Sequence, residues 1–427
     1  MNTQDALTGP FQSRLTAEFR SAITYLDTTP PVGPRIYYER TVCVRMSETG
    51  GSEPGFGNQR VREIYRDGMY DGETPAYPIA YEDLREAAWE EMDERARAYV
   101  HGGSGTEETF RRNTDFSAHR IVPRMLRGVE DRDLSVELFG DTQAFPVMVT
   151  PLGVQSLLHD EGELATARAC AALDVPFTLS SLSSTPMAEV AEALGDTTQW
   201  FQFYWSSTRA VARSFLDRAE TAGYAAIVLT VDAPTLGWRD RLLERGYYPF
   251  LDGEGVANYF SDPDFRAALD APPEEDPQAA VDLFLEIFGD ESLTWSDLSF
   301  LREHTDLPIV LKGVLHPDDA RKALDHGADA VQVSTHGGRQ VDGSISAVEA
   351  LPVIVDAVGA EADVTLDSGI RRPADALKSL APGADAVMLG RPCAYALAVG
   401  GAEGGETHLT HVLADPDLTL RQPRHDA

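Results

Sequence analysis

Short apolar segments alternate along this chain with segments in which apolar residues recur at helical spacing. Eight of these segments are typical of buried parallel strands, and they cover Phe145–Thr150, Pro176–Ser180, Trp200–Trp205, Ala225–Val231, Pro308–Gly313, Asp329–Ser334, Asp363–Ser368 and Asp385–Gly390. Helical patterns lie between them, at Gly162–Leu173, Pro186–Leu194, Thr208–Ala222 and Pro317–His326. Repeated strand–helix units of this kind predict an α/β fold, a (β/α)8 TIM barrel. An open doubly wound sheet is disfavoured, because no Gly-x-Gly-x-x-Gly sequence follows the first strand.

The part of the chain before the barrel divides in two. Residues 1–45 carry a small excess of arginine over acid, whereas Met46 begins an acidic stretch. We interpret 1–45 as an extension, or as sequence upstream of a natural start at Met46. Residues 46–114 are predicted to form an N-terminal segment with helices, including one amphipathic helix over Tyr81–Tyr99. The barrel would then span 115–420.

The interval between the fourth and fifth predicted strands is far longer than the others. It contains an acidic and proline-rich insertion at about Arg241–Leu293. Long loops within compact domains are commonly lids or disordered segments. On a barrel, this insertion would lie at the carboxyl ends of the strands, above any active site.

The charge of the chain excludes two classes of partner. With 36 Lys+Arg and 69 Asp+Glu the formal net charge is −33, which would repel nucleic acid and anionic membranes. Lysine occurs only at positions 312, 322 and 378. An acidic surface with so little lysine indicates halophilic adaptation, because salt screens the self-repulsion. No membrane span, signal peptide or paired cysteine motif is present, so we expect a cytoplasmic protein without metal.

Polar side chains end all eight predicted strands, where a barrel has its active site. They are Thr150, Ser180, Gln202 with Tyr204, Thr230 with Asp232, Lys312, Ser334 with His336, Asp367, and Gly390 with Arg391.

Several residues at these strand ends and in the loops after them point to specific chemistry. Lys312 ends an apolar strand and needs an anionic partner, since an unpaired buried ammonium is costly. His336 and Arg339 lie three residues apart on a glycine-hinged loop, so one could take a proton while the other binds a carboxylate. Arg239 adds a second cation, and Asp232 could orient the histidine.

The loops after the seventh and eighth strands have the composition of a phosphate site. Asp367-Ser368-Gly369-Ile370-Arg371 follows one strand and Gly390-Arg391 follows the other. Barrels bind phosphate at these two loops, where glycines let backbone N–H groups face the oxygens.

Together these segments resemble the FMN-dependent α-hydroxy-acid oxidising family over roughly Tyr81 to Leu420. The Ser334–Gln340 segment is the most specific part of the resemblance. Within the family the chain is most similar to the lactate 2-monooxygenases, through Asp131–Gly140, Trp200–Trp205, Gly237–Arg239, Ala257–Tyr259, Ser261–Pro263 and Asp367–Gly369.

The resemblance implies an FMN enzyme that oxidises a small L-2-hydroxy acid, specifically L-lactate to acetate, CO2 and water, with O2 as co-substrate. His336 would take the substrate proton, paired with Asp232, and Tyr204 would contact the hydroxyl oxygen. The substrate carboxylate would be bound by Tyr99, Arg239 and Arg339. The family also implies a homo-oligomer, a tetramer or octamer.

The cofactor-binding residues implied by the resemblance fall into two groups. Those around the flavin ring are Thr150, Pro151, Leu152, Gly153, Ser180, Gln202, Thr230, Lys312 and Ser334, with Lys312 beside the N1–C2 edge. Those around the phosphate are Asp367, Ser368, Gly369, Arg371, Gly390 and Arg391.

Three positions depart from the family pattern: Thr335 replaces a commoner Asn, Leu182 stands where plant oxidases have Trp, and Gly153 replaces an Ala. They bear on substrate size and on the handling of oxygen. One alternative is an oxidase or dehydrogenase that releases the 2-oxo acid. Two others are an FMN barrel isomerase acting on a diphosphate, and a flavin-binding barrel without catalysis.

Overall fold

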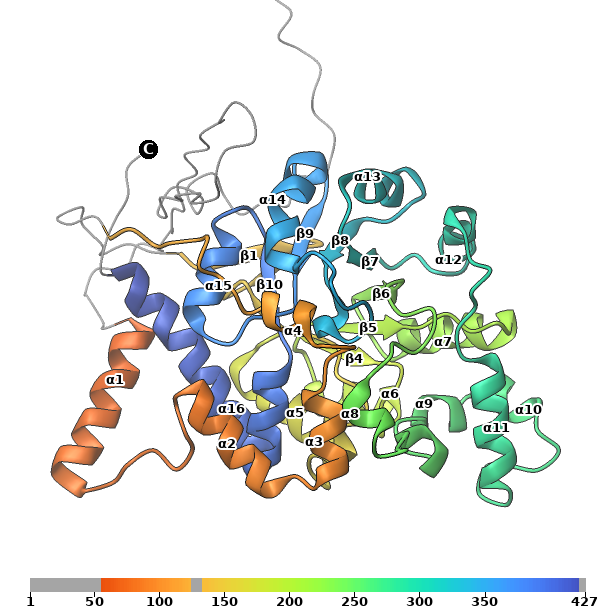
Figure 1. The fold of residues 1–427 in the computed structure, drawn as a ribbon, viewed down its shortest axis with the longest axis horizontal. Helices are drawn as coiled ribbons and strands as arrows, with labels where there is room; N and C mark the ends of the chain where they lie inside the picture. Colours follow the sequence, from red (N-terminus) through yellow and green to blue (C-terminus); the bar gives the residue numbers. More distant parts are fainter. Residues whose placement is uncertain (1–54, 124–132, 422–427) are drawn as a thin grey trace, which may run out of the picture.

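The computed structural model describes residues 55–123 and 133–421, and its centre is a closed barrel of eight parallel strands (Figure 1). The strands are β3 (Val147–Val149), β4 (Phe177–Ser180), β5 (Gln199–Phe203), β6 (Ala226–Thr230), β7 (Ile309–Val314), β8 (Ala330–Val333), β9 (Asp363–Leu366) and β10 (Ala386–Leu389). Each pairs with the next along the chain, and β10 closes the barrel against β3. The predicted (β/α)8 barrel is confirmed, and each predicted strand overlaps one of these strands, with β5 beginning one residue before its predicted segment and β7 ending one residue after it.

The outer ring of the barrel is made of helices that follow the strands. They are α5 (Gly162–Leu173), α6 (Met187–Leu194), α7 (Arg209–Thr221), α12 (Leu298–His304), α13 (Pro317–Asp325), α14 (Ala347–Val358), α15 (Pro373–Leu380) and α16 (Arg391–Arg421). Local sequence fixes where several begin: Pro317 starts α13, and Ser346 with Glu349 forms a capping box for α14. Among the described residues, none of the helices is both long and apolar enough to cross a membrane.

The segment before the barrel contains α1 (Phe56–Arg66), a π-helical turn (Asp67–Asp71), α2 (Tyr81–Glu91), α3 (Glu94–His101) and α4 (Glu108–Arg112). The single helix predicted over Tyr81–Tyr99 is wrong, because α2 and α3 are separate. Met92 is extended (ψ 142°), and the Asp93 carboxylate accepts a hydrogen bond from Ala96 N at 2.7 Å and caps α3. The periodicity continues across this break, which is why pattern alone missed it. Residues 1–45 lie outside the described residues.

A short hairpin of β1 (Val136–Leu138) and β2 (Asp141–Gln143) precedes the barrel and was not predicted. Strands of three residues are too short to give a periodic signal.

The insertion after β6 is a folded body of short helices. It contains α8 (Asp240–Leu243), a 3-10 turn (Pro249–Asp252), α9 (Ala257–Phe260), α10 (Pro263–Ala267), α11 (Pro277–Ile287) and a second 3-10 turn (Trp295–Asp297). Its prolines begin helices, since Pro263 and Pro277 stand at the starts of α10 and α11. Tyr259 and Phe284 are fully buried, and their rings lie 4.9 Å apart.

Asp262 joins the insertion to the barrel helices. Its carboxylate is buried and accepts hydrogen bonds from Ser214 Oγ (2.6 Å) and Arg218 Nη1 (3.0 Å) on α7. The same carboxylate caps α10 through the N–H groups of Asp264 and Phe265.

Replacing Asp262 with Ala should destabilise the protein by about 2 kcal/mol or more, because several donors to one charged acceptor lose their partner together. Chemical denaturation followed by circular dichroism measures the change in unfolding free energy. Asp282→Ala is the matched control, since that carboxylate is exposed on α11 and accepts only from Gln278. Equal stability of the two variants would contradict this role for Asp262.

Candidate active site

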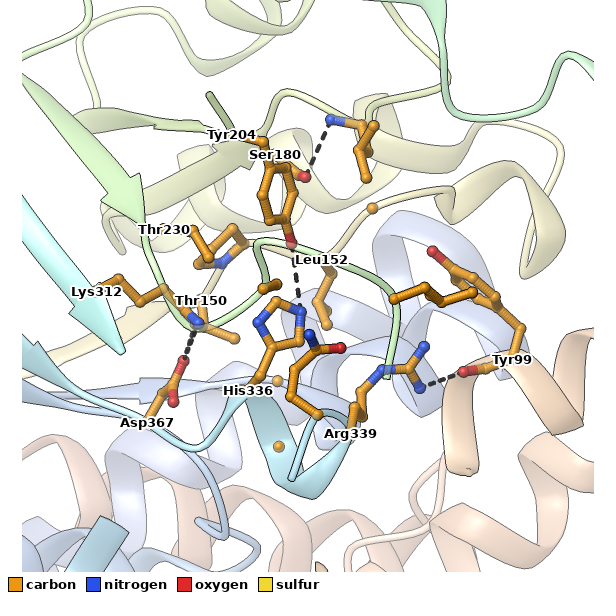
Figure 2. A pocket seen from close by; sticks show the side chains of 18 of the residues that line it. Tyr99, Thr150, Leu152, Ser180, Tyr204, Thr230, Lys312, His336, Arg339 and Asp367 are labelled. Carbon is orange, nitrogen blue, oxygen red and sulfur yellow. Dashed lines mark hydrogen bonds and ion pairs between the residues drawn. The ribbon is translucent and has the colours of Figure 1, made fainter. Parts of the chain in front are cut away.

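A cavity of about 430 Å³ opens at the carboxyl end of the barrel strands (Figure 2). Every barrel strand contributes a residue to its wall, either from the carboxyl half of the strand or from the loop after it, as expected for a barrel of this kind. The predicted site residues that line it are Tyr99, Thr150, Pro151, Leu152, Gly153, Ser180, Tyr204, Thr230, Arg239, Lys312, His336, Arg339, Asp367, Ser368, Gly369, Arg371, Gly390 and Arg391.

His336 is held between an acid and a phenol. Its Nδ1 lies 2.8 Å from Asp232 Oδ1, and its Nε2 lies 3.3 Å from Tyr204 Oη (Figure 2). The backbone at His336 is left-handed (φ 55°), and its N–H donates to Ser334 Oγ at 3.0 Å. Because an ionised Asp232 accepts the Nδ1 proton, Nε2 carries the lone pair that faces the cavity.

A chain of buried charges supports this histidine. Lys312 Nζ lies 3.4 Å from Asp232 Oδ2 and 4.0 Å from Asp367 Oδ2, and its side chain is 4% exposed. Burial acts to raise the pKa of Asp232, but Lys312 and His336 outweigh it and lower that pKa to about 2. Burial lowers the pKa of His336, and the charge of Asp232 opposes part of that effect. The pair is therefore carboxylate and neutral imidazole near neutral pH.

Two arginines from different loops meet on another wall. Arg239 is 8% exposed and donates to Gln340 Oε1 at 2.9 Å, and Arg339 donates to the backbone oxygens of Tyr99 and Gly102 (Figure 2). Burial and the nearby charge of Arg239 lower the pKa of Arg339. Neither guanidinium has a carboxylate partner within 55–123 and 133–421, so the pair forms a site for an anion.

Residues 99–113, which we call the strap, fasten the two arginine-bearing loops together. Ser104 N donates to Gly338 O at 2.9 Å, and Ser104 Oγ donates to Trp238 O at 3.0 Å. The Asp342 carboxylate accepts from the N–H groups of Thr106 and Glu108. Sequence reasoning missed the strap contacts, because they join positions more than a hundred residues apart.

The residues around the cavity fit a cofactor with polar edges. Thr230 Oγ1 on the wall and Gln202 Nε2 directly behind it are buried without a hydrogen-bond partner among the described residues. Such atoms require a partner from a ligand or from water. Gly390 leaves room beside Thr150, whose Cγ2 would lie 3.2 Å from a Cβ at that position.

The predicted phosphate loops form one end of the cavity, although some of their side chains are engaged elsewhere. Ser368 Oγ accepts from Gly337 N at 2.9 Å, and Arg391 donates to the backbone oxygens of Val100, Gly337 and Gly102. The backbone here is left-handed at Ser368 (φ 72°) and Gly369 (φ 110°), a conformation that turns successive N–H groups toward one point.

Three predicted site residues, Asp232, Gln202 and Ser334, lie behind the cavity wall instead of on it. Gln202 Oε1 accepts from Ser180 Oγ at 2.9 Å. Through such contacts these residues orient the side chains that do line the cavity.

The insertion supplies lining residues that sequence reasoning missed, namely Tyr248, Phe250, Leu285 and Phe288. Phe288 lies against Tyr204, with ring centroids 5.3 Å apart. Tyr248 and Phe250 belong to a local group of aromatic residues at 247–250, whereas no such group marks Leu285 and Phe288.

Comparison with known proteins identifies the family. Residues 88–423 match the model of the FMN-dependent dehydrogenases. The chain belongs to the FMN-dependent dehydrogenase family. Its cofactor is FMN, as predicted, and membership in a family of FMN-dependent α-hydroxy-acid oxidases and dehydrogenases is confirmed.

Relatives in this family include an L-lactate oxidase of Lysinibacillus sphaericus, which is 42% identical over 345 residues, 81% of this chain and 89% of the relative. The FMN-dependent alpha-hydroxy acid dehydrogenase qulF of Penicillium citrinum is 42% identical over 364 residues, 84% and 90% of the two chains. A crystal structure of mandelate oxidase with benzoyl-formic acid has a TM-score of 0.70 and 36% identity, and the match covers 81% of this chain and 95% of that one.

Removing the charge of Asp232 should lower the pKa of His336 further, because that charge favours the imidazolium. In Asp232→Asn the ring should therefore stay neutral to a lower pH than in the wild type. NMR titration of the histidine ring protons measures this, and the spectrum of His336→Gln identifies the resonance. An unchanged or raised pKa would show that the two groups are not coupled as the 2.8 Å contact indicates.

Proposed function

We propose that this member of the FMN-dependent dehydrogenase family oxidises L-lactate, or a closely related small L-2-hydroxy acid, with net conversion to acetate, CO2 and water. The observation that carries the proposal is a neutral histidine paired with a carboxylate, in the same cavity as two buried arginines. Relatives named L-lactate oxidase and L-lactate dehydrogenase, at 42% and 41% identity, support lactate as the substrate.

In this proposal the arginine pair binds and orients the substrate. The carboxylate lies between Arg239 and Arg339 with Tyr99 beside it, and the α-hydroxyl faces His336 Nε2 and Tyr204 Oη. Burial raises the pKa of Tyr204, so its hydroxyl remains a neutral hydrogen-bond donor. Charge-assisted hydrogen bonds fix the position and orientation of the carboxylate, so that the α-carbon faces the cofactor.

His336 then takes a proton from the substrate at Nε2, and Asp232 stabilises the imidazolium that results. FMN, when bound, supplies the acceptor for the two electrons removed from the α-carbon. Lys312 would hold a positive charge against the polar edge of the cofactor while its own charge is balanced by Asp232 and Asp367. The insertion covers part of this space and limits the access of water.

Monooxygenation requires that the 2-oxo acid stay bound while O2 is reduced. Lactate and O2 give pyruvate and hydrogen peroxide, and peroxide formed beside bound pyruvate converts it to acetate, CO2 and water. Two features support retention. The arginine pair binds the carboxylate of pyruvate as well as that of lactate. The insertion, whose Tyr248 and Phe288 line the cavity, can act as a lid that delays release.

Gly153 provides no extra room for O2, contrary to the expectation from the missing methyl group. A Cβ at this position would lie 2.9 Å from Leu182 O and 3.2 Å from Leu182 Cβ, so Leu182 already fills that part of the wall. The case for product retention therefore rests on the arginine pair and the insertion.

Replacing His336 with Gln should leave FMN bound and slow its anaerobic reduction by L-lactate by about 10²–10⁴-fold, the usual contribution of a general base. Stopped-flow absorbance measures the reduction. His326→Gln is the control, since that ring is exposed at the end of α13. A rate within a few-fold of the wild type would exclude His336 as the base.

Product analysis in air, without catalase, distinguishes the proposed reaction from that of an oxidase. We expect acetate and CO2 in amounts equal to the lactate consumed, with little free peroxide. Stoichiometric pyruvate and peroxide would instead show an oxidase with rapid product release. Failure of O2 to reoxidise the reduced enzyme would show a dehydrogenase that uses another acceptor.

A further inference from the structure

Glu163 is a buried carboxylate that the proposed reaction does not use. It lies in the first turn of α5, is 0% exposed, and has no cationic partner among the described residues. An uncompensated charge in such a place is expensive. Its Oε1 instead accepts two backbone hydrogen bonds, from Gln155 N at 3.0 Å and Ser184 N at 3.1 Å. Burial raises the pKa of Glu163, and these two N–H groups act in the opposite direction.

The two donors belong to different loops of the cavity wall. Gln155 lies in the loop after β3, two residues beyond Gly153, and Ser184 lies in the loop after β4, two residues beyond Leu182. The loops also touch directly, since Val154 N donates to Leu182 O at 2.9 Å. Glu163 therefore joins the two loops that carry Gly153 and Leu182 into the cavity.

The first of these loops is held in a strained conformation. Val154 has φ 59° and ψ 46°, in the left-handed region that a β-branched residue rarely adopts. Such a conformation costs free energy and persists only where the surrounding structure fixes it. The strain coincides with the close approach of Gly153 to the backbone of Leu182.

The side chain of Gln155 adds a second tie from the same helix. Gln155 Nε2 donates to Leu152 O at 3.1 Å, and Gln155 Oε1 accepts from Thr166 Oγ1 of α5 at 2.6 Å. Two side chains of α5 thus hold residues 152–155, one through the backbone N–H of Gln155 and the other through its side chain.

We propose that Glu163 is a positioning residue that sets the gap between Gly153 and Leu182 and so the fit of the cavity wall against FMN. It acts through the acceptor oxygen Oε1 and not through its negative charge. This inference rests on the proposed placement of FMN along Thr150–Gly153. The base and the arginine pair come from other loops, so the step that they perform does not depend on this wall.

Two substitutions separate the acceptor from the charge. Glu163→Gln keeps an acceptor oxygen at the same reach and removes the charge, whereas Glu163→Asp keeps the charge and withdraws the oxygen by one methylene. Glu189→Gln is the control, on the exposed face of α6. Apoprotein of each variant is titrated with FMN, and the dissociation constant is read from the loss of flavin fluorescence. The visible spectrum of bound FMN, its reduction by lactate and its reoxidation by O2 are then measured separately.

We expect Glu163→Gln to resemble the wild type and the Glu189→Gln control. In Glu163→Asp we expect FMN affinity to fall by about tenfold, as for the loss of one or two ordinary hydrogen bonds. Its flavin spectrum and its rate of reoxidation should also change, while the rate of reduction at saturating lactate stays within a few-fold.

The opposite ranking, with Gln impaired and Asp normal, would show that the charge is what matters and would overturn the proposal. Normal behaviour of both variants would also overturn it. So would an equal fall of all rates and affinities in both together with lower thermal stability, since that indicates a merely structural role. The titration and the spectrum remain informative even if lactate proves not to be the substrate, so the two proposals fail separately.

Discussion

The pairing of Lys312 with Asp232 and Asp367 is the constraint on which the active site depends. Three charges from the ends of β7, β6 and β9 lie almost out of contact with water. Lys312 makes the burial of both carboxylates tolerable, and they do the same for its ammonium. The charged state of Asp232 fixes the tautomer of His336. Asp367 accepts a hydrogen bond from Thr150 Oγ1 at 2.8 Å, which links the end of β9 to the end of β3, the strand against which β10 closes the barrel. Loss of any one charge would therefore disturb the base and the cofactor wall together.

The repulsion between Arg239 and Arg339 is the second constraint on the cavity. Arg239 and Arg339 are buried near each other with hydrogen bonds to neutral oxygens only among the described residues, and their mutual repulsion favours an anionic ligand. The strap supplies most of those neutral oxygens and holds the loops against the repulsion. A segment outside the barrel thus completes the binding site of an enzyme whose chemistry resides at the strand ends.

The insertion shows how an acidic, proline-rich sequence becomes part of the site. Its prolines begin helices, Asp262 joins it to α7, and its aromatic side chains pack into the main core. Composition alone suggested a loop. It could not show that these prolines occupy the first turns of helices, where proline is favourable. The same core places Tyr248 and Phe288 over the cavity.

The sequence by itself determined the barrel, the family, the cofactor and the roles of His336, Arg339 and Lys312 as candidates. Periodicity reports burial, and the residues at strand ends converge in any closed barrel. Only the tertiary structure decided what these residues touch. The engagement of Arg391 by three carbonyls, the strap contacts and the hydrogen bond from Ser184 N to Glu163 all depend on backbone groups distant in the chain. A backbone N–H or carbonyl is the same at every position, so the sequence carries no local signal for such contacts.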